Sequence, residues 1–168
     1  MAIATLRNNK VIETSIIRAA NTTAYAAGDV VENSTASGFT FATAARGNAM
    51  GGQINHAMLF SSHSNGTPLD GELWVMDTLM ALDVDNLAFT PTDAEMRNMV
   101  GVIPFATGNG FVGTAAGNVL IPASRTFLPM RFVTATADDA LYGVLVARNA
   151  YVPASAEVIT LKLFIEQD

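Results

Sequence analysis

The chain has 168 residues, of which half are apolar and 14% are charged, with no cysteine and a formal net charge of −6. One domain of this length can bury a substantial core without metals or disulfides. The acidic balance and the lack of a Lys/Arg cluster exclude a groove that follows phosphates, so we expect no nucleic-acid partner. The start of the chain does not have the pattern of a signal peptide, and no apolar run reaches about 18 residues. We therefore expect a soluble protein without a membrane partner, whose mature form starts near Met1.

The first predicted unit in chain order is an N-terminal arm over residues 1–12, followed by a single β-sandwich domain over residues 13–168. Short strands are predicted over 11–19 and 24–31. In INHAMLFSS, which begins at residue 54, the alternation of apolar and polar residues predicts a strand. The side chains expected on one face of that strand are Ile54, His56, Met58 and Phe60.

GELWVMD (71–77) predicts a strand that is apolar on both faces, in which Trp74 is expected to be buried in the core. Segments 33–50 and 104–127 are rich in Gly, Ala, Ser, Thr and Asn with isolated phenylalanines. These segments are predicted to be long loops or weak strands held by single aromatic residues. Because long irregular connections in a compact domain are often functional, they are candidate interfaces.

One short helix is predicted near 91–100, because Thr92-Asp93-Ala94-Glu95 has the spacing of a capping box after Pro91. It is expected to end at Gly101. The residues expected on its buried side are Met96, Met99 and Val100.

Two strands are predicted at the C-terminus. LYGVLVARNAY (141–151) is apolar on both faces, which is typical of a central strand. In the last strand, Ile159, Leu161, Leu163 and Ile165 alternate with Thr160, Lys162 and Glu166. Short strands separated by Gly and Asn turns predict an all-β, antiparallel sandwich or barrel.

A search for catalytic, cofactor-binding or metal-binding residues gives none. His56 and His63 are seven residues apart, which would place them on opposite faces of a continuous strand, without carboxylates at ligand spacing. Asp83 and Asp85 lack the glycine and closing glutamate of a calcium loop, so a solvated turn is the favoured interpretation. The run from Ser61 to Ser64 lacks a G-x-S-x-G elbow, and no phosphate-binding loop is present.

Three segments carry a resemblance to a known group of proteins. They are TTAYAAGDVVE (22–32), ELWVMDTLMALDVDNLAFTPTDAEMRNMVGVIPF (72–105) and LYGVLVARNAYVPASAEVITLKLFIEQD (141–168). The chain resembles small virion structural proteins of tailed bacteriophages, of the capsid decoration, or cement, type. That resemblance implies a jelly-roll-like sandwich, a homo-oligomer that is often a trimer, the major capsid protein as partner, and a location on the capsid surface.

Basic residues are the candidate contacts with a capsid, because they could pair with carboxylates of its subunits. The first choice is the arm, from Ala2 to Lys10. The second choice is three arginines, of which one lies in an Ala/Gly-rich stretch and two flank the segment TFLPM. The candidate residues are Leu6, Arg7, Lys10, Arg46, Arg125 and Arg131.

Three classes of function remain open. A non-enzymatic virion protein that stabilises a capsid leads. A receptor-binding or glycan-binding sandwich of a phage tail or head is the alternative, and it requires an exposed aromatic platform. An enzyme comes last.

Overall fold

The computed structural model describes residues 8–33, 37–63, 69–81, 84–106, 111–112, 117–120 and 128–168. It is mostly β, with 49% of residues in strands and 3% in helix. Eleven strands and one helix are described. They are β1 (Asn8–Ile17), β2 (Val30–Val31), β3 (Phe39–Phe41), β4 (Gly51–Ser61), β5 (Gly71–Met76), α1 (Asp93–Met96), β6 (Met99–Phe105), β7 (Phe111–Val112), β8 (Asn118–Leu120), β9 (Met130–Val133), β10 (Leu141–Ala147) and β11 (Val158–Gln167).

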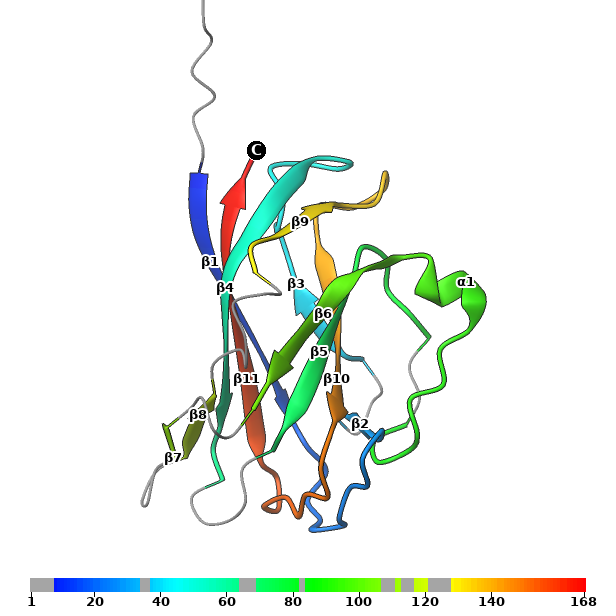
Figure 1. The fold of residues 1–168 in the computed structure, drawn as a ribbon, viewed down its shortest axis with the longest axis vertical. Helices are drawn as coiled ribbons and strands as arrows, with labels where there is room; N and C mark the ends of the chain where they lie inside the picture. Colours follow the sequence, from blue (N-terminus) through cyan, green and yellow to red (C-terminus); the bar gives the residue numbers. More distant parts are fainter. Residues whose placement is uncertain are drawn as a thin grey trace, which may run out of the picture.

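The strands form two antiparallel sheets that face each other (Figure 1). The first sheet has the order β1-β11-β4-β8-β7, with β9 also paired to β4. The second has the order β2-β10-β5-β6, with β3 also paired to β10. The chain changes sheets between β1 and β2, β3 and β4, β4 and β5, β6 and β7, β9 and β10, and β10 and β11. The all-β sandwich predicted from the sequence is therefore confirmed, and its jelly-roll topology stays a prediction.

The core lies between the two sheets and follows the alternation of apolar residues. Every second side chain of β11, from Ile159 to Ile165, is buried there. The second sheet contributes Leu73 and Leu145 from its inner face. Phe39 and Phe41 of the short β3 are also buried, which confirms that single aromatic residues anchor the segment 33–50.

β10 has a second apolar face, as predicted for a central strand. Its Val144 and Val146 pack outside the sandwich against Met76, Met80 and neighbouring side chains. The segment between β5 and β6, which contains α1, covers part of this outer face (Figure 1). Within the described ranges, no helix has the length and apolar character needed to cross a bilayer.

Ile54 lies on a different face of β4 from the one predicted. The pairing of β4 with β11 shifts at this point, because His56 pairs with Phe164 and Ile54 pairs with Ile165, which leaves Asn55 as an extra residue. Such a bulge reverses the inside-outside alternation. Ile54 therefore faces the core, while His56 and the residues at alternate positions after it are only partly buried.

The capping box is confirmed, but the helix is shorter than predicted. The Thr92 side chain accepts a hydrogen bond from the backbone N–H of Glu95, and the Glu95 side chain accepts one from the backbone N–H of Thr92. The helix ends at Met96, and none of its residues is buried. Met99 is exposed and begins β6, so Gly101 lies inside a strand. Pairing with β5 therefore replaces the expected continuation of the helix.

Two other predicted boundaries differ from the structure. Residues 8–12, expected in the arm, belong to β1 and pair with β11. The strand predicted over 24–31 is reduced to β2 and two isolated bridges, of which one joins Tyr25 to Tyr151. The segment 104–127, predicted to form a long loop or weak strands, contributes the end of β6 and the short β7 and β8.

Candidate functional site

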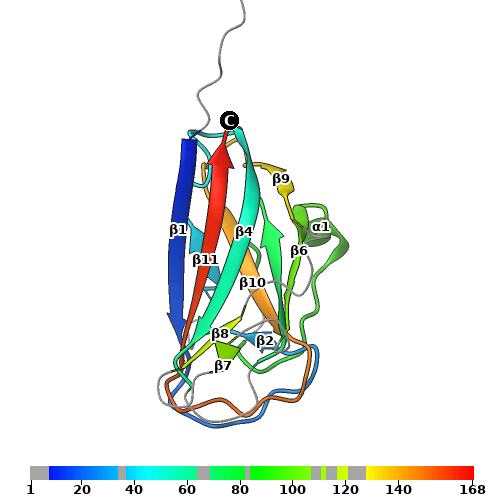
Figure 2. The ribbon, with the colours of Figure 1, turned by 60° about the vertical axis from the view of Figure 1, so that its left-hand side comes forward.

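The start of β1 and the end of β11 lie together at one end of the sandwich, which we call the arm end because the predicted arm leads into it. The arm end also includes the segment 42–50 and β9 (Figures 1 and 2). Lys10 donates a hydrogen bond from Nζ to the carbonyl of Thr43 at 3.0 Å, and a second one to its hydroxyl. Gln167 donates to the same carbonyl at 2.9 Å. These bonds attach the segment 42–50 to both strands.

The other described basic candidates also lie at the arm end. Arg46 is exposed within the segment 42–50. Arg131 is an exposed residue of β9, and its guanidinium lies 3.8 Å from the Asp168 carboxylate. The structure thus brings Lys10, Arg46 and Arg131 to one end of the molecule from three separate parts of the chain.

Leu6, Arg7 and Arg125 lie outside the described residues.

The arm end carries both signs of charge, because the segment after β9 adds acidic residues beside 42–50. Ala45 donates its backbone N–H to the carbonyl of Asp139 at 3.0 Å. A partner of this end would therefore meet a mixed surface of basic and acidic groups, which favours a specific orientation.

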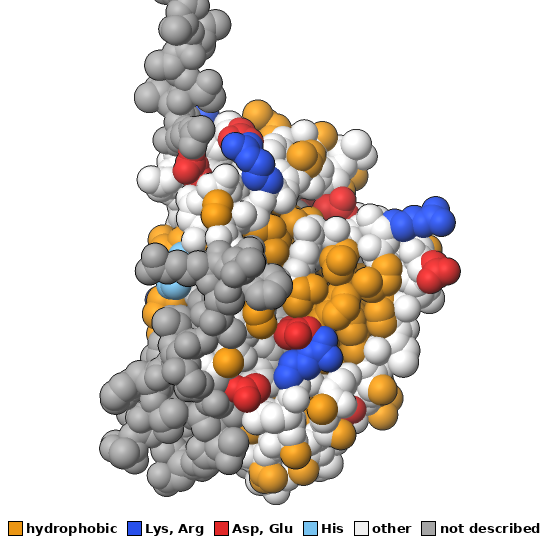
Figure 3. All heavy atoms as spheres, viewed as in Figure 1, with side chains coloured by type: hydrophobic (Ala, Val, Ile, Leu, Met, Phe, Trp, Pro, Cys, Tyr) orange, Lys and Arg blue, Asp and Glu red, His pale blue; other side chains and the backbone are white. Residues whose placement is uncertain are grey.

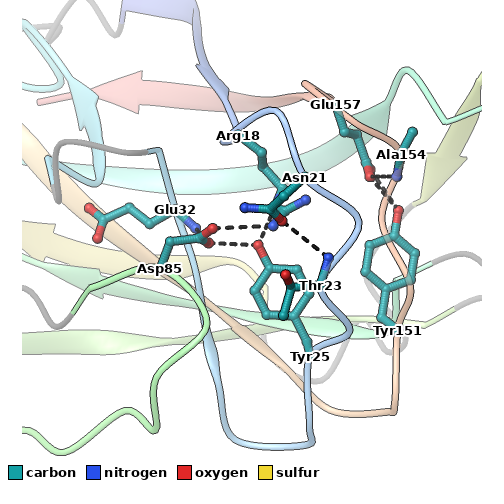
Figure 4. A network of polar contacts seen from close by, with 9 residues as sticks. All are labelled: Arg18, Asn21, Thr23, Tyr25, Glu32, Asp85, Tyr151, Ala154 and Glu157. Atoms are coloured by element: carbon teal, nitrogen blue, oxygen red, sulfur yellow. Dashed lines mark hydrogen bonds and ion pairs between the residues drawn. The ribbon is translucent and has the colours of Figure 1, made fainter.

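The opposite end of the sandwich holds a polar cluster around Arg18 (Figure 4). The Arg18 side chain is fully buried and forms an ion pair with Asp85, with Nη2 and Oδ2 3.2 Å apart. Its guanidinium carbon lies 4.6 Å from the centre of the Tyr25 ring, and its Nε donates to the Tyr25 hydroxyl. Tyr25 in turn donates to Asp85 at 2.6 Å.

A second buried carboxylate, Glu157, lies close to this cluster. It accepts hydrogen bonds from the hydroxyls of Tyr151 at 2.7 Å and Ser61 at 2.6 Å, and from the backbone N–H of Ala154 at 3.2 Å. The rings of Tyr25 and Tyr151 stack with their centres 6.3 Å apart. Stacking and hydrogen bonds thus join the loops after β1 and β10 into one unit.

The two tyrosines of this end stay protonated as donors. Burial raises the pKa of Tyr25 far above its ordinary value, and the hydrogen bond to Asp85 raises it further. Burial likewise raises the pKa of Tyr151, and the negative charge of Glu157 adds to the effect. Ionisation of a buried phenol that donates a hydrogen bond to a carboxylate is unfavourable, because it would place a second negative charge beside the first in the protein interior. The arrangement is suited to holding loops together.

The two histidines are far from forming one site. His56 lies in β4 with its ring 5.3 Å from that of Phe164, and His63 follows the end of β4, beside Tyr151. β4 therefore ends between the two histidines, and they do not share the continuous strand assumed in the sequence analysis. Among the side chains that the structure describes, no group of three or more His, Cys, Asp or Glu is arranged to hold a metal ion.

Asp85 corrects the interpretation of its segment as a solvated turn. It is nearly buried and accepts from Arg18, Tyr25 and the backbone N–H of Glu32. Asp83 lies outside the described ranges. Sequence reasoning also missed two buried charged residues of this end. Arg18 directly follows β1, and Glu157 directly precedes β11. The available signal was a charged residue at the boundary of an apolar strand. This signal does not show whether the charged side chain is buried in an ion pair or exposed to solvent.

Trp74 is half-buried on the outer face of the second sheet, so the expectation of full core burial is wrong. Its ring lies 5.1 Å from that of Phe89, and its Nε1 is buried with no hydrogen-bond partner among the described atoms. Hydrophobic side chains gather on the face of the molecule formed around β5 and β6 (Figure 3). This apolar face is a second surface on which a partner could dock.

The fold and these surfaces define an all-β sandwich protein with a mixed-charge end, a buried polar end and an apolar outer face. Comparison of the sequence with protein-family models and with curated proteins found no match.

Proposed function

We propose that this protein is a non-enzymatic structural component of a bacteriophage virion. In this proposal it decorates the capsid exterior and stabilises it by binding across major capsid protein subunits, in clusters that the sequence resemblance predicts to be trimers. Such a role needs a rigid body with a broad contact surface and no reactive group.

The observation that carries the proposal is the gathering of Lys10, Arg46 and Arg131 at the arm end. The sequence predicts these three residues as contacts, and they come from segments far apart in the chain. Leu6 and Arg7 come shortly before β1 in the sequence and lie outside the described residues. Lys10 and two exposed arginines at one end can pair with carboxylates of a capsid lattice.

Co-sedimentation with purified capsids tests the proposal. The protein is mixed with unexpanded and with expanded capsids of the phage that produces it, and the bound fraction is measured against protein concentration. We expect saturable binding to the expanded form, because a cement site is created when neighbouring subunits reach their final positions. Absence of saturable binding to either form would contradict the capsid role.

Charge-reversal variants then test the proposed surface. Arg46→Glu and Arg131→Glu should each weaken binding to the capsid and reduce its dependence on salt. Arg97→Glu is the matched control, because Arg97 is an exposed arginine at the end of α1, away from the arm end. Equal binding by all three variants would show that the arm end is not the contact surface.

A receptor-binding or glycan-binding role is the second candidate, and the partly exposed pair of Trp74 and Phe89 favours it. Sugars commonly stack on such aromatic side chains. Titration with glycans, followed by the fluorescence of the single tryptophan, tests this role. A saturable shift of the emission together with no capsid binding would favour it over decoration.

A further inference from the structure

β1 is a long and regular edge strand of the first sheet. It pairs with β11 over its full length, from Asn8 to Ile17, without a shift of register. Among the parts of the chain that the structure describes, no strand pairs with the other side of β1. Figure 2 shows it as the outermost drawn strand of its sheet. An edge of this kind is a template for pairing with another chain.

The hydrogen bond that follows β1 shows which backbone groups face the open edge. Arg18 donates its backbone N–H to the carbonyl of Glu157 at 3.0 Å, in continuation of the β1–β11 register. Backbone groups point to alternate sides along a strand, so even-numbered residues of β1 bond to β11. The residues whose N–H and C=O groups face the open edge are Asn9, Val11, Glu13, Ser15 and Ile17.

The sequence of β1 is nearly symmetric about Thr14. Ile12 and Ile16 flank it on the core side, and Val11 and Ile17 flank it on the outer side. Val11 and Ile17 are 55% and 61% exposed, which is high for large apolar side chains in a strand. If two copies pair antiparallel about a two-fold axis at Thr14, each Val11 faces Ile17 of the second copy. Each Ile12 then faces Ile16 of the second copy.

The charges of β1 are compatible with this pairing. Glu13 would face Ser15 of the second copy, and its carboxylate already lies 2.7 Å from Lys162 in its own protomer. Lys10 would face Arg18 of the second copy, at the ends of the paired segment and outside its central pairs. Both of these side chains are held by partners within their own protomer. No pair of like charges therefore stands opposite at the centre, where it would be destabilising.

The other described edges carry features that oppose strand pairing. β6 contains Pro104, which lacks an N–H group. The edge strands β2, β3, β7 and β9 have only two to four residues each. Proline and short length are common ways to protect an edge. β1 has ten residues and neither of these features.

We propose that β1 is a self-association surface, at which two copies of the chain pair antiparallel about Thr14 and form one continuous sheet. The edge-facing residues of the two strands then exchange backbone hydrogen bonds, and the exposed Val11 and Ile17 become cross-strand neighbours. The contact is isologous and closes with two copies. This contact between two β1 strands is independent of the proposed capsid role. If the protein also forms trimers, the contact would join copies from adjacent trimers.

A single cysteine tests the predicted register directly, because the chain has no cysteine of its own. In a non-hydrogen-bonded antiparallel pair the two Cα atoms are about 4.5 Å apart, within the range of a disulfide. Thr14→Cys should therefore cross-link to its symmetry mate under mild oxidation. Asn9→Cys is the control in the same strand, because its symmetry mate would lie roughly 33 Å away at about 3.3 Å per residue. Cross-linking of both variants, or of neither, would overturn the register.

Paired charge variants test the interface without oxidation. Analytical ultracentrifugation of the unmodified protein should show a mass that rises with concentration to twice the 17.7 kDa of the chain. Val11→Lys/Ile17→Lys places like charges opposite and should raise the dimer dissociation constant at least about tenfold. Val11→Lys/Ile17→Glu places opposite charges together and should restore pairing.

Val133→Lys/Val152→Lys is the matched control, because these two valines are equally exposed and lie outside β1. It should dimerise like the unmodified protein. A protein that stays monomeric, or an assembly that is equally insensitive to the Lys/Lys and Lys/Glu variants, would overturn the proposal. Because capsid binding is measured separately, this failure is distinguishable from failure of the capsid role.

Discussion

Replacing Asp85 with alanine tests how the end opposite the arm is held together. Asp85 accepts hydrogen bonds from Arg18 at 3.2 Å, from Tyr25 at 2.6 Å and from the backbone N–H of Glu32 at 3.0 Å. The Arg18 side chain has no exposed surface, and that of Asp85 is 9% exposed. Asp85→Ala therefore leaves a buried guanidinium without its ion-pair partner.

The expected loss of unfolding free energy is about 3–5 kcal/mol, the usual cost of removing one partner from a buried ion pair. This is a large share of the roughly 5–15 kcal/mol that stabilises a typical domain. Glu72→Ala is the matched control, because it breaks an ion pair with Arg148 in which both side chains are partly exposed. That change should cost at most about 1 kcal/mol.

Urea unfolding, followed by the fluorescence of Trp74, measures both changes. A shift of the midpoint at constant slope reports stability alone. The double variant Arg18→Met/Asp85→Ala should be more stable than Asp85→Ala, because it removes the stranded charge. If Asp85→Ala costs no more than Glu72→Ala, or if the double variant recovers nothing, then the buried pair does not organise this end.

The remaining predictions concern the tyrosines, one glycine and the helix cap. The pKa of Tyr142 is raised to about 12 by its hydrogen bond to Asp138, and those of Tyr25 and Tyr151 are raised further. Ultraviolet titration should therefore detect little tyrosinate up to pH 11. Because these pKa values are raised in the folded state, the stability they contribute is complete below pH ~10 and is lost as pH rises above it. Gly143→Ala places a methyl group 2.7 Å from a core leucine side chain, and calorimetry should show a loss of about 1–3 kcal/mol. Thr92→Ala removes the cap of α1 and should cost about 1 kcal/mol in the same assay, whereas Thr92→Ser should be nearly neutral.

Local patterns in the sequence predicted local structure correctly. The alternation from Ile159 to Ile165 gave β11 and its buried face, and the apolar run from Leu141 gave a central strand. The capping box at Thr92 also formed as predicted. The strand patterns repeat with the period of one element, and the capping box spans four consecutive residues. The interactions behind these patterns therefore lie within one element or on one face of it.

The predictions failed where a distant strand decided the outcome. Helix propensity continued past Met96, but pairing with β5 drew Met99 into β6. At Asn55 a bulge against β11 reversed the faces of β4. A bulge depends on the register of two strands more than 100 residues apart in the chain, and periodicity within one strand carries no information about it.

The candidate sites divide in the same way. The sequence by itself determined which residues are basic, apolar or able to cap a helix, and therefore the class of fold and the choice of Lys10, Arg46 and Arg131. Only the tertiary structure decided that these three share one end, that Asp85 is buried beside Arg18, and that no described strand pairs with the outer side of β1. These properties depend on which segments become neighbours, and contacts between residues far apart in the chain form only when the two sheets pack together.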